Sequence, residues 1–280
     1  MTFLKMSDAT KIFFEDSGDG EAILFAHGLN SSHMMNESFY SEFRDDFRVI
    51  LYDQRGHGLS DTPHRHMNVK RLGMDMNEII ESLGLDNLTV FGHSMGAATI
   101  YSYIDQFGCD KLKAVIASDM SPYMRNDGWG GGIAQVKWSD EDFFKDFDRI
   151  FDDVGSAAWH ISKSIMNPGL SKLCEDEQNE MIRIYRQNTD AFTMASLWYS
   201  LFRCDQRPAM ANITVPLLYI MPDNPLYSME AVEYIKNNVK SSFFLDDDFP
   251  GSTHSILRQN PHEVAESVKK FLKKINRVPK

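Results

Sequence analysis

The sequence has few cysteines and no excess of positive charge, and it has no long hydrophobic run. Its three cysteines, at positions 109, 174 and 204, are odd in number and far apart, so they fit neither a disulfide framework nor a Cys-x-x-Cys metal pair. No apolar segment approaches the length that crosses a bilayer, and residues 1–19 lack the cationic and apolar regions of a signal peptide. We therefore expect a soluble protein of a reducing compartment, the cytoplasm, with no membrane partner.

Negative charge dominates the composition. The 40 acidic and 29 basic residues give a formal net charge of −11 and a pI near 5.3. Nucleic-acid phosphates recruit Lys and Arg, so we expect no nucleic-acid partner. No Gly-x-Gly-x-x-Gly or P-loop pattern implies a nucleotide cofactor. His64 and His66 lack partners in a metal-ligand pattern. The expected partner is a small-molecule substrate, without metal or cofactor, and the oligomeric state is left open.

Short apolar runs alternate with helical patterns in the first part of the 280-residue chain, of which 42% is apolar. The runs predict strands over residues 3–14, 22–27, 48–52, 88–91 and 112–118, with a helix around 69–83. This alternation indicates the α/β class, with a mainly parallel sheet and crossover helices. Functional groups of such sheets lie beyond the carboxyl ends of the strands.

From about residue 122 to 211 the strand signals vanish and helical periodicity takes over. The alternation then resumes, with a strand at 215–221, a helix at 229–238, a strand at 242–245 and a final helix over 261–275. We therefore predict a core of residues 1–121 and 212–280, interrupted by a helical lid at 122–211. All four tryptophans fall within this lid; they are Trp129, Trp138, Trp159 and Trp198. They can form a packing core between the helices, an apolar, aromatic underside over a moderately apolar substrate, or both. We expect a lid with such an underside, in which only some of these residues contact ligand.

The pentapeptide Gly-His-Ser-Met-Gly at residues 92–96 stands between a predicted strand and a predicted helix. In that context, Gly-x-Ser-x-Gly is typical of a nucleophile elbow. Gly92 and Gly96 remove side chains that would collide in a tight turn. The turn lifts the Ser94 hydroxyl clear of the sheet and directs the first amides of the helix at the reaction centre. An ordinary glycine-rich turn also satisfies this pattern, so the interpretation needs support from the rest of the chain.

Four motifs, in order and at these spacings, resemble those of the α/β-hydrolase family, and the likeness spans nearly the whole chain. They are His27-Gly28 after an early strand, residues 52–60 (Tyr-Asp-Gln-Arg-Gly-His-Gly-Leu-Ser), residues 92–96, and residues 249–254 (Phe-Pro-Gly-Ser-Thr-His). Residues 118–122 and 126–129 further resemble the cofactor-free haloperoxidase-like and esterase branch. The resemblance implies an α/β-hydrolase fold with an inserted lid. It also implies a serine hydrolase that cleaves a small ester-like carbonyl substrate through an acyl-enzyme.

The resemblance also implies the roles of particular residues. Ser94 is the expected nucleophile, and a serine hydroxyl is weak until a base takes its proton. His254 is the expected base, because the family order places serine first and histidine near the end; His57 and His93 are poorer candidates. The backbone N–H groups of Leu29 and Met95 are the expected oxyanion donors.

The acid of the triad has two candidates. The family most often takes it from the loop after the strand at 217–221, but Pro225 occupies that position and Asp223 lies two residues early. Some relatives, including haloalkane dehalogenases, take the acid from the end of the strand before the lid, where this chain has Asp119. A loop aspartate that braces the lid entry is the ordinary structural explanation of Asp119. We favour Asp119 as the acid and keep Asp223 as the alternative.

Two other functions stay open from the sequence. The elbow residue is serine rather than aspartate, which disfavours haloalkane dehalogenase and epoxide hydrolase chemistry. The same triad can instead serve C–C bond cleavage, acyl transfer or peracid formation. A ligand receptor that keeps the pocket without turnover is the alternative from a different class, supported only by the irregular acid loop.

Overall fold

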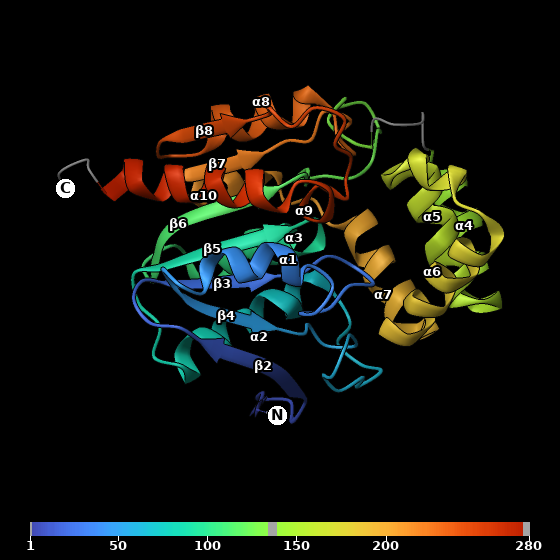
Figure 1. Cartoon of the computed structure of the whole chain (residues 1–280), viewed down its shortest axis with the longest axis horizontal. Coiled ribbons are helices and arrows are strands. Elements are labelled where there is room, and N and C mark those ends of the chain that lie inside the picture. The colour runs from blue at the N-terminus through green and yellow to red at the C-terminus, as the bar shows by residue number, and fades with distance from the viewer. Residues whose placement is uncertain (1, 134–138, 277–280) are drawn as a thin grey trace.

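A single twisted sheet of eight strands organises the computed structural model, which describes residues 2–133 and 139–276 (Figure 1). The strand order is β1-β2-β4-β3-β5-β6-β7-β8. β2 is antiparallel to both of its neighbours, and the other pairs are parallel. The predicted α/β class with a mainly parallel sheet is confirmed. The strands are β1 (Thr2–Lys5), β2 (Lys11–Ser17), β3 (Ala22–Ala26), β4 (Arg48–Tyr52), β5 (Leu88–His93), β6 (Leu112–Ser118), β7 (Leu217–Ile220) and β8 (Phe243–Asp246).

The single strand predicted over residues 3–14 is wrong, because the chain reverses there into the β1–β2 hairpin. The turn is closed by a hydrogen bond of 2.8 Å from the Met6 N–H to the Thr10 carbonyl. The Asp8 carboxylate accepts from the Thr10 N–H at 3.1 Å, and Ala9 takes a positive φ of 71°. An aspartate that bonds the backbone two residues on is a turn signal, which the apolar residues on either side obscured.

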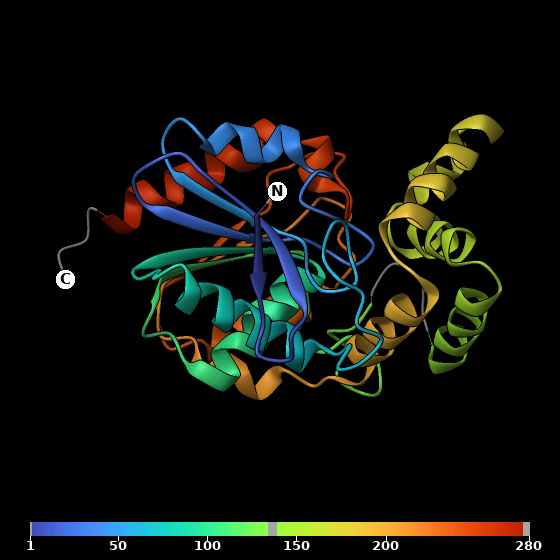
Figure 2. The same cartoon turned by 90° about the horizontal axis from the view of Figure 1, so that it is seen from below.

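Helices cover both faces of the sheet (Figure 2). α1 (Glu37–Tyr40) and α10 (Pro261–Asn276) lie on one face, and α2 (Val69–Ser82), α3 (Met95–Phe107) and α8 (Met229–Asn238) lie on the other. Neighbouring strand residues alternate between the two resulting cores: Leu24 packs with the α2–α3 side and Phe25 with the α1–α10 side. Because successive strand side chains point to opposite faces, a strand buried on both sides is apolar throughout, as the sequence of β3 indicated.

Four longer helices stand beyond one end of the sheet, on the right of Figure 1. They are α4 (Asp140–Asp152), α5 (Val154–Ile161), α6 (Glu175–Asn188) and α7 (Ala191–Arg203), and they lie between β6 and β7 in the chain. The π turn η2 (Ser162–Met166) and the 3-10 turn η3 (Pro168–Lys172) connect α5 to α6. These helices fall within the segment predicted as a lid; its boundaries at 122 and 211 stay a prediction.

Aromatic side chains hold these helices together. Phe143 of α4 stacks on Phe202 of α7 with ring centroids 3.8 Å apart. The Phe143 ring also stacks with Trp198 of α7, with centroids 6.2 Å apart. Trp159 and Trp198 are 4% and 2% exposed. Trp138 lies outside the described residues. The described tryptophans of α5 and α7 therefore pack between helices, which is the structural role of such residues rather than a ligand-binding one.

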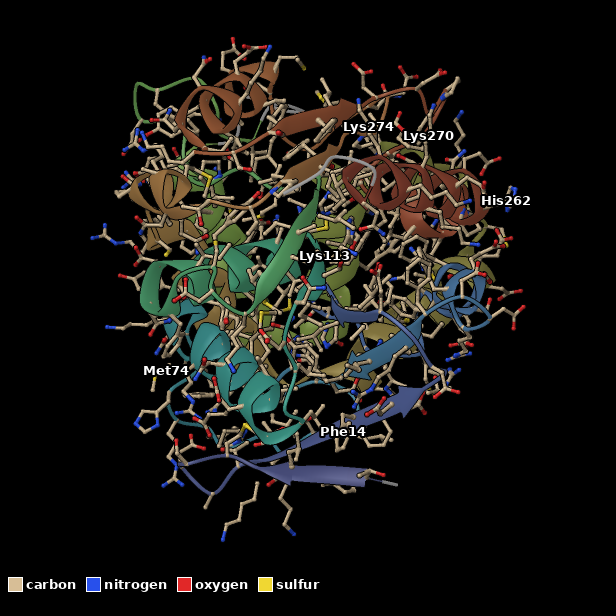
Figure 3. The ribbon with its side chains drawn as sticks, turned by 90° about the vertical axis from the view of Figure 1, so that its left-hand side faces the viewer. Phe14, Met74, Lys113, His262, Lys270 and Lys274 are labelled. Carbon is tan, nitrogen blue, oxygen red and sulfur yellow. The ribbon has the colours of Figure 1, made fainter. Side chains whose placement is uncertain are left out.

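The remaining short helices are connections: η1 (Ser41–Phe43), η4 (Arg207–Asn212) and α9 (Ile256–Gln259). The end of the sheet away from α4–α7 carries exposed lysines of α10, among them Lys270 and Lys274 (Figure 3). Within residues 2–133 and 139–276, no helix is both long and apolar enough to span a membrane.

Gly96 allows the start of α3 to approach β3 closely. A Cβ atom at this position would lie 2.0 Å from the Ala26 carbonyl oxygen and 2.6 Å from its carbon. Backbone atoms in a central strand cannot move aside without breaking the sheet. The second glycine of the pentapeptide is therefore required by packing as well as by the turn.

Replacing Gly96 by alanine should lower the free energy of unfolding by about 3 kcal/mol, because the new methyl group overpacks the β3–α3 contact. Urea unfolding, followed by circular dichroism, measures this loss. Gly84→Ala is the matched control: its φ is +60° but nothing lies within 4 Å of the added atom. It should cost only about 1 kcal/mol of backbone strain. Equal losses in the two variants would contradict the close-packing argument.

Candidate active site

Ser94 sits at a strained turn between β5 and α3. Its φ of 54° and ψ of −125° lie in a region that side chains other than glycine rarely adopt, at a cost of about 1–3 kcal/mol. The turn is held by a hydrogen bond of 3.0 Å from the Ser94 N–H to the Ser118 carbonyl. The Ser94 carbonyl in turn accepts from the Ala97 N–H at 2.8 Å, which starts the helix. This strand–turn–helix geometry is that of a nucleophile elbow.

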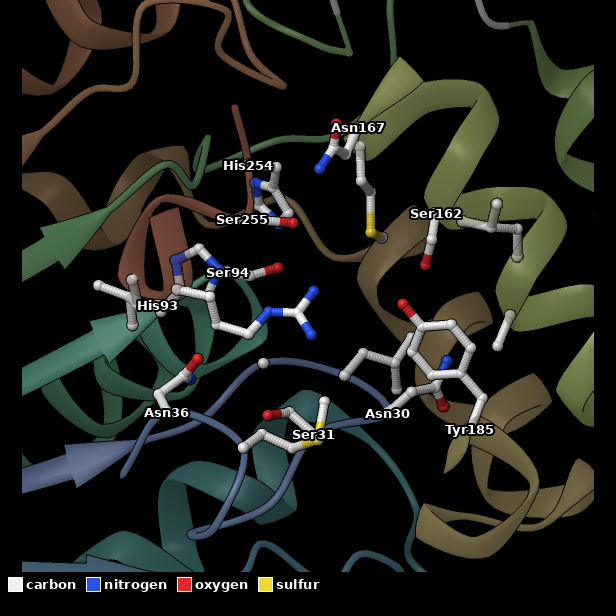
Figure 4. A pocket seen from close by; sticks show the side chains of 18 of the residues that line it. Asn30, Ser31, Asn36, His93, Ser94, Ser162, Asn167, Tyr185, His254 and Ser255 are labelled. Carbon is white, nitrogen blue, oxygen red and sulfur yellow. The ribbon is translucent and has the colours of Figure 1, made fainter. Parts of the chain in front are cut away.

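His254 lies on the loop between β8 and α9 and is 5% exposed. Its Nδ1 is 2.7 Å from the Oδ2 atom of Asp119. Because a carboxylate accepts, Nδ1 carries the proton and donates it, which leaves Nε2 as the acceptor of the ring. The ring also packs against His93, with centroids 4.8 Å apart. His254 and Ser94 line the same pocket, and Figure 4 shows both side chains on one wall of it.

Asp119 follows β6 and is fully buried. Its φ of 43° turns the chain sharply at the strand end, and its N–H donates to the Ile220 carbonyl at 3.0 Å. Oδ2 accepts from the Leu226 N–H at 3.0 Å as well as from His254. Oδ1 has no hydrogen-bond partner among the described residues. The carboxylate is thus anchored by the loop after β7 and aimed at the histidine.

Asp223 lies elsewhere. It is exposed, and its Oδ2 accepts from the Gly251 N–H at 3.0 Å. Its own N–H donates to the Ser252 hydroxyl, also at 3.0 Å. These contacts brace the turn that precedes His254, and no hydrogen bond joins Asp223 to His254 in the described structure. Of the two candidate acids, Asp119 is the one that the fold brings to the imidazole.

The loop after β3 carries Leu29 past the elbow. A Cβ atom on Gly28 would lie 3.3 Å from the Ser94 Cβ, so the loop touches the serine. The N–H groups of Leu29 and Met95 have no hydrogen-bond acceptor within the described part of the chain. Met95 is the first residue of α3, where backbone N–H groups are free to bind an anion.

Two buried histidines hold this loop. His27 donates through Nδ1 to the Gly28 carbonyl at 2.7 Å and accepts at Nε2 from the Gln54 N–H at 2.9 Å. His57 donates through Nδ1 to the Arg55 carbonyl at 3.1 Å and accepts at Nε2 from the Asn30 N–H at 3.2 Å.

These rings are held neutral by their surroundings. Burial lowers the pKa of His27, and burial, with a smaller contribution from His27, lowers the pKa of His57 to about 3. A neutral imidazole keeps one acceptor nitrogen, as both contacts to backbone N–H groups require. His57 therefore supports the loop and lies outside the group formed by Ser94, His254 and Asp119.

The pocket beside Ser94 has a volume of about 90 Å³. α5–α7 and their connections form the side facing the elbow, chiefly with aliphatic and thioether groups: Ala158, Ile161, Met166, Leu170 and Met194, with Tyr185. The expected aromatic underside is therefore wrong for the described lining, where Tyr185 is the only aromatic residue apart from the histidines. The tryptophans of α5 and α7 pack between helices instead. The pattern of residue types in the sequence does not distinguish helix packing from contact with a ligand.

Several polar residues in the pocket were missed by the sequence analysis. They are Asn30, Asn36, Ser162, Asn167 and Arg258 (the first four labelled in Figure 4). Asn30 lies two residues after Gly28 of the His27-Gly28 motif, and Arg258 lies four residues after His254. Proximity in sequence to the motifs was the available signal for these two. Nothing in the sequence pointed to Asn167, which lies where the π turn ends.

Comparison with known proteins decides the family. A family model described as the alpha/beta hydrolase fold matches residues 21–158, and 97% of the chain superposes on solved structures of this fold. The chain is an α/β-hydrolase. This confirms the family, the fold class and an enzymatic hydrolase function. The fold of this α/β-hydrolase is similar to that of an esterase from Exiguobacterium antarcticum, with a TM-score of 0.84 and 22% identity over 97% of this chain and 99% of that one.

Curated relatives of this α/β-hydrolase include enzymes of more than one activity. A 2-(acetamidomethylene)succinate hydrolase from Mesorhizobium japonicum is 24% identical over 265 residues, which are 92% of this chain and 90% of the relative. A non-heme haloperoxidase from Rhodococcus erythropolis is 32% identical over 127 residues, or 44% of this chain and 46% of the relative. The relatives thus support hydrolase chemistry. They differ in activity, so the substrate class has to be inferred from the residues of the site. In the described part of this α/β-hydrolase, no group of three or more His, Cys, Asp or Glu side chains could hold a metal ion.

Proposed function

We propose that this α/β-hydrolase is a serine hydrolase that cleaves a small ester-like carbonyl substrate through an acyl-enzyme. Ser94 is the nucleophile, His254 the general base and Asp119 the acid that orients the histidine. The observation that carries the proposal is the 2.7 Å contact between His254 Nδ1 and Asp119 Oδ2, on a histidine that shares its pocket with an elbow serine.

The first half of the reaction forms the acyl-enzyme. Ser94 Oγ attacks the carbonyl carbon while His254 Nε2 takes the hydroxyl proton, and the carbonyl oxygen becomes an oxyanion. Asp119 holds the ring in the required tautomer and stabilises the imidazolium. The tetrahedral intermediate collapses as the bond to the leaving alcohol breaks, and His254 returns its proton to that alcohol.

The second half repeats these steps with water. His254 takes a proton from water, whose oxygen attacks the acyl carbon, and collapse releases the acid and restores the Ser94 hydroxyl. In both halves the N–H groups of Leu29 and Met95 stabilise the oxyanion. One such donor typically contributes about 3–4 kcal/mol to lowering the barrier. Both amides have no acceptor within the described residues, as this role requires.

The pocket favours a small, moderately apolar substrate. Its volume of about 90 Å³ suits a short acyl chain. Its lining of methionines and aliphatic side chains suits an apolar one, because thioethers adapt to irregular shapes. We propose α4–α7 and their connections as the lid over this pocket. The cytoplasmic location, and the lack of nucleic-acid and membrane partners, are predictions from composition.

A second candidate function uses the same triad. The likeness to a relative named a non-heme haloperoxidase favours attack of hydrogen peroxide, in place of water, on the acyl-enzyme. The product is then a peracid, formed with no change of oxidation state at the enzyme. Chromatography of products in the presence of peroxide distinguishes peracid from acid.

A fluorophosphonate probe should label Ser94 and no other serine, because this hydroxyl shares its pocket with His254 and with the free amides of Leu29 and Met95. Peptide mass spectrometry locates the adduct. Prior incubation with an ester should slow labelling, since both compete for one nucleophile. An unlabelled Ser94 in folded protein would reject the proposed mechanism and favour the non-catalytic receptor.

A further inference from the structure

Arg258 is the one permanently charged residue among the described residues that line the Ser94 pocket. It lies on α9, four residues after His254, and its side chain is exposed to solvent. No Asp or Glu side chain is part of the described lining. The chain as a whole has more acidic than basic residues, 40 against 29. The described lining of this pocket has the opposite balance, with one guanidinium and no carboxylate.

The guanidinium of Arg258 has no partner in the part of the chain that the structure describes. Several other exposed or half-buried arginines form ion pairs, as Arg125 does with Asp140 and Arg207 with Asp205, each at 2.6 Å, whereas Arg203 resembles Arg258 in having none in the described structure. Only the backbone N–H of Arg258 makes a hydrogen bond, to the Ser255 carbonyl at 3.0 Å. Five guanidinium donors are therefore available at the pocket.

The neighbouring histidine adds no second charge. Burial, followed by the proximity of His254 and of Arg258, lowers the pKa of His93 well below its ordinary value. His93 is therefore neutral. The pocket then offers a single positive charge on a planar group with parallel donors. That single charge balances one carboxylate, and the parallel donors match its two oxygens.

We propose that Arg258 makes this enzyme selective for substrates that carry a carboxylate, which the guanidinium binds while Ser94 attacks the ester carbonyl. The inference rests on the proposed serine hydrolase function and names the substrate class of the same site. Half-esters of short dicarboxylic acids are the model substrates, because they carry an ester and a carboxylate on one short chain that can reach two residues lining the same pocket.

The test compares monomethyl glutarate, which carries a carboxylate, with dimethyl glutarate, which carries none, by chromatographic assay of methanol release. In wild-type enzyme, kcat/KM should be higher for the half-ester. Arg258→Gln should lower kcat/KM for the half-ester about 10- to 100-fold, the range for a lost charge-assisted hydrogen bond. The diester should change less than about threefold, because it makes no ionic contact. Arg258→Lys should recover part of the loss, since lysine keeps the charge without the paired donors.

Lys270→Gln is the matched control. It removes one positive charge from an exposed residue on the far side of the molecule (Figure 3) and should leave both rates unchanged, because salt screens charges at such distances. Equal losses for the two esters in Arg258→Gln would overturn the inference, as they would indicate a structural role. So would an unchanged preference for the half-ester.

Calorimetric binding of glutarate separates this inference from the proposed function, because binding needs no turnover. Glutarate should bind wild-type enzyme and Ser94→Ala alike and should bind Arg258→Gln at least about 10-fold more weakly. If neither ester is hydrolysed and Ser94 is not labelled, the serine mechanism fails, and this binding ratio still decides the role of Arg258. Undiminished glutarate binding by Arg258→Gln, or none by wild type, would reject carboxylate recognition.

Discussion

Replacing Ser94 by alanine should lower kcat for ester hydrolysis by at least about 10⁴-fold, because no other group can form the acyl-enzyme. The residual rate reflects water attack on a carbonyl held by the amides of Leu29 and Met95. KM should change little, because the Ser94 hydroxyl is not needed to hold the substrate before the reaction begins. Stopped assays at high enzyme concentration, with chromatographic detection of the acid, measure rates this low.

The control for this variant is Ser156→Ala, which removes an exposed hydroxyl from α5 and should leave kcat unchanged. Alanine at position 94 has to adopt the same positive φ of 54° as Ser94. The backbone strain of the turn is therefore the same in the wild type and in Ser94→Ala. Unfolding by urea should therefore show a difference below about 1 kcal/mol. A well-folded Ser94→Ala enzyme that retains more than a small fraction of the wild-type rate would show that Ser94 is not the nucleophile.

Replacing Asp119 by asparagine should lower kcat by about 10³- to 10⁴-fold, the cost typical of losing the correct histidine tautomer. Asparagine is close in shape, but its amide group cannot accept from His254 Nδ1 and from the Leu226 N–H with the strength of a carboxylate. The wild-type contacts are 2.7 Å and 3.0 Å. Steady-state kinetics on one ester substrate, with circular dichroism to verify folding, measures the loss.

Asp223→Asn provides the comparison within the same enzyme. Asp223 is exposed and accepts from the Gly251 N–H, a bond that the asparagine carbonyl can also accept. The expected loss in kcat is therefore less than about threefold. Near-normal rates in Asp119→Asn, together with a large loss in Asp223→Asn, would reverse the assignment of the acid.

Local sequence was sufficient for most of the fold. The helix predicted around 69–83 is α2 at Val69–Ser82, and the one predicted at 229–238 is α8 at Met229–Asn238. The Asn68 side chain accepts from the Arg71 N–H and marks the start of α2, a signal present in the residues themselves. The β1–β2 hairpin was missed because its turn uses a single aspartate and an alanine at positive φ, against the preference of alanine.

The lid shows why residue type alone does not give function. Some of its aromatic residues were expected to contact ligand, but Trp159 and Trp198 are buried between helices. Large rings bury the most apolar area, so they are used where helices need to be held together. The pocket is instead lined by Met166, Met194 and small aliphatic groups, whose pattern on a helix is the same as that of any core face.

The sequence by itself determined the α/β class, the elbow at Ser94 and the late histidine, because each depends on residues adjacent in the chain or on their order. Only the tertiary structure decided that Asp119 rather than Asp223 reaches His254. That contact joins residues 135 positions apart and follows from where β6 ends relative to the loop after β8. The same packing places Arg258 in the pocket without an acidic partner among the described residues. Spacing along a chain carries no information on which of two nearby carboxylates a fold turns inward, because side-chain direction is set by the backbone conformation at the strand end.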